Sequence, residues 1–118
     1  MKINIELDTF DKNLTSDIIG KKGISSGDKR DIFRNTTLEY QLTLKKFKVE
    51  SPDTIYFTLD ISGNVESSTS IFATWLHDNI KTRAIKLRIN RSDVEIDESK
   101  IKNTINQIVK NKNESRGQ

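Results

Sequence analysis

Few residues of this sequence could carry acid–base or nucleophilic chemistry. The chain has one histidine, His77, and no cysteine, which excludes disulfides, thiolate metal ligands and cysteine nucleophiles. Asp78 follows His77, but adjacent residues of a helix point in different directions, so this carboxylate cannot orient the imidazole as a general base. The sequence also lacks a phosphate-binding glycine loop, a zinc-binding helix and a nucleophile elbow. We therefore expect no enzyme, no metal and no cofactor.

A glycine-flanked basic segment is the first candidate binding site. Residues 18–24 read IIGKKGI, which is similar to the GxxG signature of KH domains, where a basic loop after a helix clamps the backbone of a single strand. The candidate residues for such nucleic-acid binding are Gly20, Lys21, Lys22, Gly23, Lys29 and Arg30. The family begins its second helix directly after this loop, whereas residues 25–27 read SSG, a poor helix start. The alternative interpretation is a solvated basic loop.

Basic residues gather in two further places, although the net charge of the chain is only +3. One cluster consists of Lys45, Lys46 and Lys48. The other lies between residues 79 and 92, which include no acidic residue. Alternation puts Lys86 and Arg88 of this segment on one face of a strand, where Glu95 of the next strand can pair with them. The overall charge excess is far weaker than that of dedicated DNA-binding domains.

Five segments alternate apolar and polar residues, which is the period of a half-buried strand. They are residues 3–7, 38–49, 55–61, 85–89 and 94–97. The apolar positions shift by one after Lys45 and Lys46, which predicts a β-bulge or a bend there. Residues 20–34 are rich in glycine and basic residues and poor in apolar ones, which predicts a mobile surface loop.

Helical spacing is clearest in residues 65–80. Apolar residues recur there every three or four positions, with Ile71 and Trp75 widening the stripe, and serines and threonine near the start favour a helix N-terminus at Glu66 or Ser67. A second stripe follows Asp97 or Ser99 as a cap and consists of Ile101, Ile105, Ile108 and Val109. A short helix over residues 11–19 is also expected.

The order of these elements predicts one α+β domain over residues 1–112, with a flexible C-terminal tail at 113–118. We expect a mostly antiparallel sheet of about five strands with two main helices packed on one face. Polar residues at alternate strand positions would line the other face, which leaves it open to a partner. The candidate partner-binding residues on this face are Tyr56, Lys86, Arg88 and Glu95.

The helix, hairpin and closing helix of the second half resemble the C-terminal half of bacterial effector-associated constant component domains. The residues that carry this resemblance are Trp75, Leu76, Arg83, Val94, Ile96 and Asp97. The first half departs from the family, since it lacks the glycine-rich approach to the central helix. The resemblance implies a non-catalytic component that connects effectors with sensors in conflict and signalling systems.

The sequence therefore favours a non-enzymatic protein-binding module, an adaptor or inhibitor in a bacterial or phage conflict or signalling system. The alternative is a KH-like binder of single-stranded nucleic acid, and a homodimer through an exposed edge strand stays open as well. The N-terminus lacks the apolar segment of a signal peptide, and no run reaches the roughly 18 apolar residues of a membrane span. We expect a cytoplasmic protein that does not bind membranes.

Overall fold

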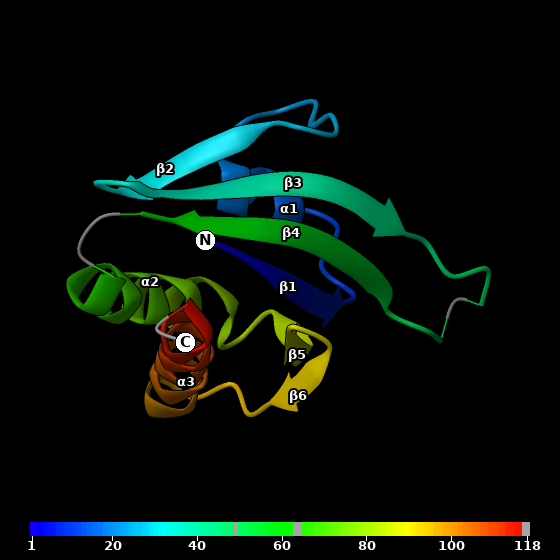
Figure 1. Cartoon of the computed structure of the whole chain (residues 1–118). Coiled ribbons are helices and arrows are strands. Elements are labelled where there is room, and N and C mark those ends of the chain that lie inside the picture. Colours follow the sequence, from blue (N-terminus) through cyan, green and yellow to red (C-terminus); the bar gives the residue numbers. More distant parts are fainter. Residues whose placement is uncertain (49, 63–64, 117–118) are drawn as a thin grey trace.

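The computed structural model describes residues 1–48, 50–62 and 65–116 (Figure 1). Its strands are β1 (Lys2–Thr9), β2 (Lys29–Phe33), β3 (Thr36–Leu44), β4 (Asp53–Ile61), β5 (Ala84–Ile89) and β6 (Ser92–Val94). Its helices are α1 (Leu14–Ile19), α2 (Val65–Ile80) and α3 (Glu98–Arg116). The strands form one antiparallel sheet in the order β2-β3-β4-β1-β5-β6. The predicted α+β class is confirmed, with six strands in place of about five.

One continuous core lies between the sheet and the helices. The two central strands supply alternate side chains to it, and Ile3, Ile5 and Leu7 of β1 and Phe57 of β4 are almost completely buried. Residues in between face the opposite side of the sheet, because successive side chains of a strand point to opposite faces. All three described helices contribute to this one core, so none of them covers the second face of the sheet.

Helix α2 buries the predicted apolar stripe against this core, and α3 packs beside it (Figure 1). Phe72 and Leu76 are fully buried. Ile71 is exposed and Trp75 is only partly buried, so the buried stripe is narrower than expected. Of the two predicted caps of α3, Asp97 is confirmed, since its Oδ2 accepts a hydrogen bond of 3.0 Å from the backbone N–H of Lys100. The helix runs through Arg116 and so overlaps the expected tail, whose last two residues lie outside the described part.

The prediction of a loop over residues 20–34 is wrong for residues 29–33, which form strand β2. Residues 29–33 pair with β3 at the edge of the sheet, and Arg30 occupies a position on the helix side. Its guanidinium donates to the backbone carbonyls of Asp17 (3.1 Å) and Ile18 (3.0 Å) and lies 5.5 Å from the ring centre of Trp75. The alternation was hidden because an arginine, whose charge is satisfied by carbonyls and a ring, stands where the pattern requires an apolar residue.

A β-bulge shifts the register of the long β3–β4 hairpin at Gln41, between Tyr40 and Leu42. The prediction of a β-bulge or a bend after Lys45 and Lys46 is confirmed in its second form, since the chain bends at Phe47 and Lys48, whereas the β-bulge lies earlier, inside β3. The bulge turns Leu42 and Leu44 to the open face, where each is about half exposed. The end of this hairpin extends past the other strands (Figure 1). We call its described residues 41–48 and 50–56 the hairpin arm.

The β5–β6 hairpin is tighter than the sequence indicated. Its turn consists of Asn90 and Arg91, whose φ angles are both positive at 48° and 71°, as a two-residue turn between antiparallel strands favours. Strand β6 therefore covers residues 92–94 rather than 94–97, and Glu95 lies beyond its end. The turn chemistry was hidden because Arg91 is an unusual residue at positive φ.

Candidate functional site

The open face of the sheet was the predicted partner surface, and Arg88 lies near its middle. Its guanidinium bonds Glu6 at 2.8 Å and Asp8 at 2.7 and 3.0 Å. The three side chains are only 20%, 14% and 16% exposed. The hydrogen bonds from Arg88, with a further one from Thr54, hold the pKa of the Asp8 carboxyl below its ordinary value. The hydrogen bonds to Asp8 and Glu6 in turn raise the pKa of Arg88. The donors of Arg88 are therefore used inside the protein.

The other three predicted residues of this face have different surroundings. Tyr56 is half-buried and lies opposite Glu6 on β1, so it shares a row across the sheet with Arg88. Lys86 pairs with Asp93 at 3.4 Å. Glu95 is exposed and lies outside the ladder, so the expected pairing of Glu95 with Lys86 and Arg88 is wrong. Asp93 instead lies opposite Arg88 and pairs with Lys86, because the shorter turn shifts the register of β6 against β5 by two residues.

The open face as a whole is acidic. Its basic residues, by strand alternation and pairing, are Lys2, Lys29, Lys86 and Arg88. Its acidic residues are Glu6, Asp8, Asp31, Glu39, Asp60 and Asp93. Most of these charges are matched within the sheet: Lys29 pairs with Glu39 at 3.6 Å, and Asp31 accepts a hydrogen bond from Thr37. Most charged side chains of the open face are thus engaged in ion pairs or hydrogen bonds with one another or with neighbouring residues.

The glycine-flanked loop was the alternative nucleic-acid site. Gly20 ends α1 in the left-handed region, at a φ of 77°, and its N–H donates to the carbonyl of Ser16, as a helix C-terminus favours. Lys21 pairs with Asp28 at 3.3 Å. Lys22 is exposed, and among the described residues no ion pair to it is found. Gly23 also has a positive φ, 69°, and nothing lies within 4 Å of the place where its Cβ would be.

The remaining two residues of that alternative lie on β2 and face opposite sides of the sheet. Lys29 is on the open face beside Glu39, whereas Arg30 points to α1 and Trp75. A strand therefore occupies the position where the KH pattern has its second helix. The structure gathers Gly20, Lys21, Lys22 and Gly23 in one loop and places the Arg30 guanidinium against Gly20, where Nη1 lies 3.3 Å from the position a Cβ would take. Lys29 lies on the opposite face of the sheet, away from this loop.

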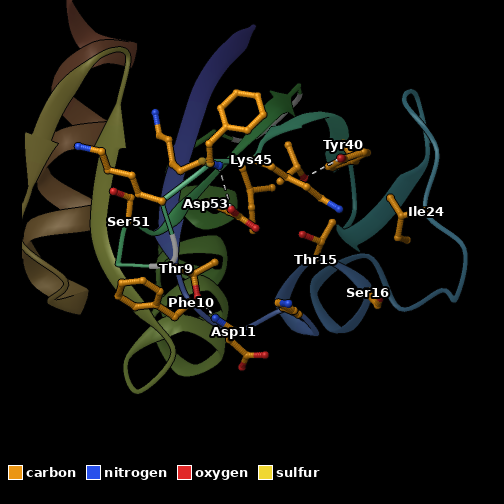
Figure 2. Close-up of a pocket in the computed structure, with 16 residues that line it drawn as sticks. Thr9, Phe10, Asp11, Thr15, Ser16, Ile24, Tyr40, Lys45, Ser51 and Asp53 are labelled. Atoms are coloured by element: carbon orange, nitrogen blue, oxygen red, sulfur yellow. Dashed lines mark hydrogen bonds between the residues drawn. The ribbon is translucent and has the colours of Figure 1, made fainter.

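A cleft of about 630 Å³ opens on the helix side of the hairpin arm (Figure 2). Its walls come from three places: the β1–α1 connection with the first turn of α1, the residue Ile24, and the hairpin arm with Tyr40. The floor includes Thr9 and Ile55, which are buried. Tyr40 and Thr43 close one side through a hydrogen bond of 2.7 Å between their hydroxyls. We call this space the hairpin cleft.

The hairpin cleft is basic at its rim. The lysines that line it are Lys12, Lys45, Lys46 and Lys48. All four are exposed, and in the described part of the chain none of them makes an ion pair. Exposed ammonium groups of this kind keep their hydration and their field, so an incoming anion meets them without displacing an internal partner.

Both carboxylates of the cleft, in contrast, are engaged. Asp11 accepts a hydrogen bond of 2.6 Å from Arg83, and this contact lowers the pKa of the Asp11 carboxyl. Asp53 accepts a bond of 3.3 Å from the backbone N–H of Lys46. Arg83 also bonds Asp17 on α1 at 2.7 Å, so it ties the β1–α1 wall of the cleft to β5. The electrostatic balance of the cleft therefore stays positive.

Two aromatic side chains stand at the same end of the molecule. Phe10 lines the cleft with 55% of its surface exposed, and Phe47 is fully exposed between the lysines of the arm. Sequence reasoning found the lysine cluster but missed both phenylalanines. A detectable signal was the position of Phe47, an apolar residue between charged ones at the tip of a hairpin, where the core cannot reach it.

The single histidine and the acidic residues of the described chain were the remaining candidates for a site. His77 Nδ1 lies 3.9 Å from Asp78, which is too long for a hydrogen bond. Within residues 1–48, 50–62 and 65–116, the His, Asp and Glu side chains form no group of three or more that could hold a metal ion. None of the helices in these ranges is long and apolar enough to span a membrane.

Comparison with known proteins found no match. No protein-family model, no curated protein and no solved structure shows significant similarity to it.

Proposed function

We propose that this chain is a non-enzymatic protein-binding module and that its partner binds at the hairpin cleft and the hairpin arm. The observation that carries the proposal is the contrast between unpaired lysines and engaged carboxylates around the cleft, next to two exposed phenylalanines. Protein interfaces combine aromatic anchors with a charged rim in this way. The arm also projects from the sheet (Figure 1), so a partner can reach it from more than one side.

This proposal moves the partner surface away from the open face of the sheet. Arg88 is already satisfied by Glu6 and Asp8, and Lys86 by Asp93. A partner that recruited these side chains would first have to break internal contacts, which reduces the net gain from any new ion pair. Tyr56 lies on the open-face side of the hairpin arm, where it neighbours the half-exposed Leu42, so it alone of the four predicted residues belongs to the proposed partner surface.

The resemblance to effector-associated constant component domains supports the biological setting of the proposal. A small chain with an open binding cleft fits an adaptor or an inhibitor in a bacterial or phage conflict system. Either role requires only that the module holds a specific protein, since neither requires a chemical step.

The test is affinity capture from a native lysate, with and without nuclease, using three forms of the full chain. The forms are the wild type, the arm variant Lys45→Glu/Lys46→Glu/Lys48→Glu, and the control Lys100→Glu/Lys102→Glu/Lys110→Glu, which changes the net charge equally on exposed positions of α3. We expect a defined protein to be held by the wild type and the control after nuclease treatment and to be lost from the arm variant.

Two results contradict the proposal. Capture that disappears with nuclease would identify nucleic acid as the direct partner and would favour the KH-like alternative. Equal capture by the arm variant would place the interface elsewhere. Circular dichroism of all three forms shows whether they are folded, which we expect because the substituted lysines are exposed.

A further inference from the structure

We infer that the ligand of the hairpin cleft is an acidic peptide segment of the partner that also carries apolar side chains. The inference rests on the proposed function and specifies the chemistry of the partner. It follows from the charge of the cleft, its size and shape, and the aromatic groups at its mouth (Figure 2).

Charge complementarity selects an anionic ligand. Lys12 stands on the β1–α1 side and Lys45, Lys46 and Lys48 stand on the arm, so positive charge borders the cleft from two sides. Arg83 neutralises the carboxylate of Asp11, and the four lysines outnumber the remaining carboxylate of the lining, Asp53, so the net charge around the cleft attracts an anion. Carboxylates of a peptide entering the cleft therefore meet ammonium groups along both borders.

The size of the cleft favours a segment of chain over a single small anion. Its volume of about 630 Å³ lies in the range of sites that enclose a ligand of drug size, roughly 300–1,000 Å³. Hydroxyl groups of Thr15, Ser16 and Ser51 also line it. A short extended peptide can use such groups for hydrogen bonds of its backbone while its side chains reach the rim.

The apolar part of the cleft explains why the ligand must be more than a polyanion. Phe10 and Phe47 are exposed to water at the mouth, and Ile24 and Tyr40 form part of the wall. Covering these surfaces removes apolar area from water, which is favourable for a ligand with leucine-like side chains. A purely charged ligand would leave this surface exposed.

The surroundings favour a peptide over nucleic acid. A nucleic-acid strand carries one negative charge per nucleotide and is held by an extended basic track. Here four lysines surround one cleft, and the open face, on the other side of the sheet, has more acidic than basic residues. A long polyanion would therefore find no continuation of the basic rim on that face.

The experiment is fluorescence anisotropy with labelled synthetic probes and the full chain. The probes are a peptide of alternating glutamate and leucine, one of alternating glutamate and serine, one of alternating lysine and leucine, and an oligothymidine. We expect the glutamate–leucine peptide to bind the wild type most tightly. The arm variant Lys45→Glu/Lys46→Glu/Lys48→Glu should weaken this binding about tenfold or more, and the α3 control variant should leave it unchanged.

A second variant separates the apolar contribution from the charge. Phe47→Ala removes an exposed ring without changing charge. It should therefore weaken binding of the glutamate–leucine peptide and leave binding of the glutamate–serine peptide unchanged. Equal losses for both peptides would overturn the apolar part of the inference. Binding of none of the peptides, equal binding of the lysine–leucine peptide, or displacement of the glutamate–leucine peptide by oligothymidine would overturn the inference as a whole.

Competition separates this inference from the proposed function. If the captured protein depends on the arm but is not displaced by the glutamate–leucine peptide, the protein-binding proposal stands and the ligand class is wrong. If the peptide binds in the cleft while no protein is captured, the ligand chemistry stands and the proposed function fails.

Discussion

The open face of the sheet and the hairpin cleft both carry several charged residues, but they use them in opposite ways. On the open face Arg88 is shared between Glu6 and Asp8 at 2.7 to 3.0 Å. In the cleft the lysines have no such partner in the described chain, and the carboxylates are occupied by Arg83 and a backbone N–H. Charge density alone therefore does not identify a binding surface. What matters is whether the charges are already paired.

The largest effect on stability should follow removal of Arg88. In Arg88→Ala the half-buried carboxylates of Glu6 and Asp8 lose their donor, and we expect the free energy of unfolding to fall by about 2 kcal/mol. Urea denaturation measures this loss. As a matched control, Lys86→Ala breaks an exposed pair with Asp93 and should cost less than about 0.5 kcal/mol. Similar losses for both variants would show that the network around Arg88 is no stronger than an ordinary surface pair.

The next effect concerns Arg83, which supports a wall of the cleft from outside. Arg83→Ala releases Asp11 and Asp17 from bonds of 2.6 and 2.7 Å, and we expect a loss of about 1 kcal/mol in the free energy of unfolding. It also leaves the carboxylate of Asp11 unneutralised in the cleft, so the affinity for the glutamate–leucine peptide should fall. If the variant loses stability but binds this peptide as tightly as the wild type, the charge of Asp11 does not influence peptide binding in the cleft.

Acid titration tests how strongly Arg88 acts on its carboxylates. The pKa values of Asp8 and Asp11 are lowered from an ordinary value of 3.8, so in the folded state these carboxylates bind protons less readily than in the unfolded state. Their contribution to stability is present above pH 3.8 and is lost as the pH falls through the lowered values. Thermal unfolding across this range should show a smaller acid-induced loss in Arg88→Ala than in the wild type. Identical pH profiles would mean that Arg88 does not govern Asp8.

The smallest effect is expected at the glycine-flanked loop. Lys22 is exposed and Lys21 pairs only with Asp28 on the same loop, so Lys21→Asp/Lys22→Asp should change neither the thermal midpoint nor the capture of a protein partner by more than the error of the measurement. Anisotropy with oligothymidine is the decisive readout. Loss of a measurable oligothymidine affinity in this variant would support the KH-like alternative over the hairpin cleft.

The sequence by itself determined the elements whose burial is periodic. Strand β1, the paired strands β3 and β4, and the helices α2 and α3 were found because each buries one face, and burial of one face imposes a period of two or of about 3.6 on the apolar residues. The α+β class follows from the order of these elements. The cap at Asp97 was also readable, because capping depends on residues within one turn of each other.

The tertiary structure alone decided which charges are free. Arg88 is separated in sequence from Glu6 by 82 residues and from Asp8 by 80. Arg83 and Asp11 are 72 residues apart. Strand β2 was missed because Arg30 finds its partners on α1 and α2. Such pairings depend on register and on a bulge at Gln41, which hydrophobic periodicity does not encode. The candidate site therefore emerged only when the fold showed which lysines had been left without a partner in the described chain.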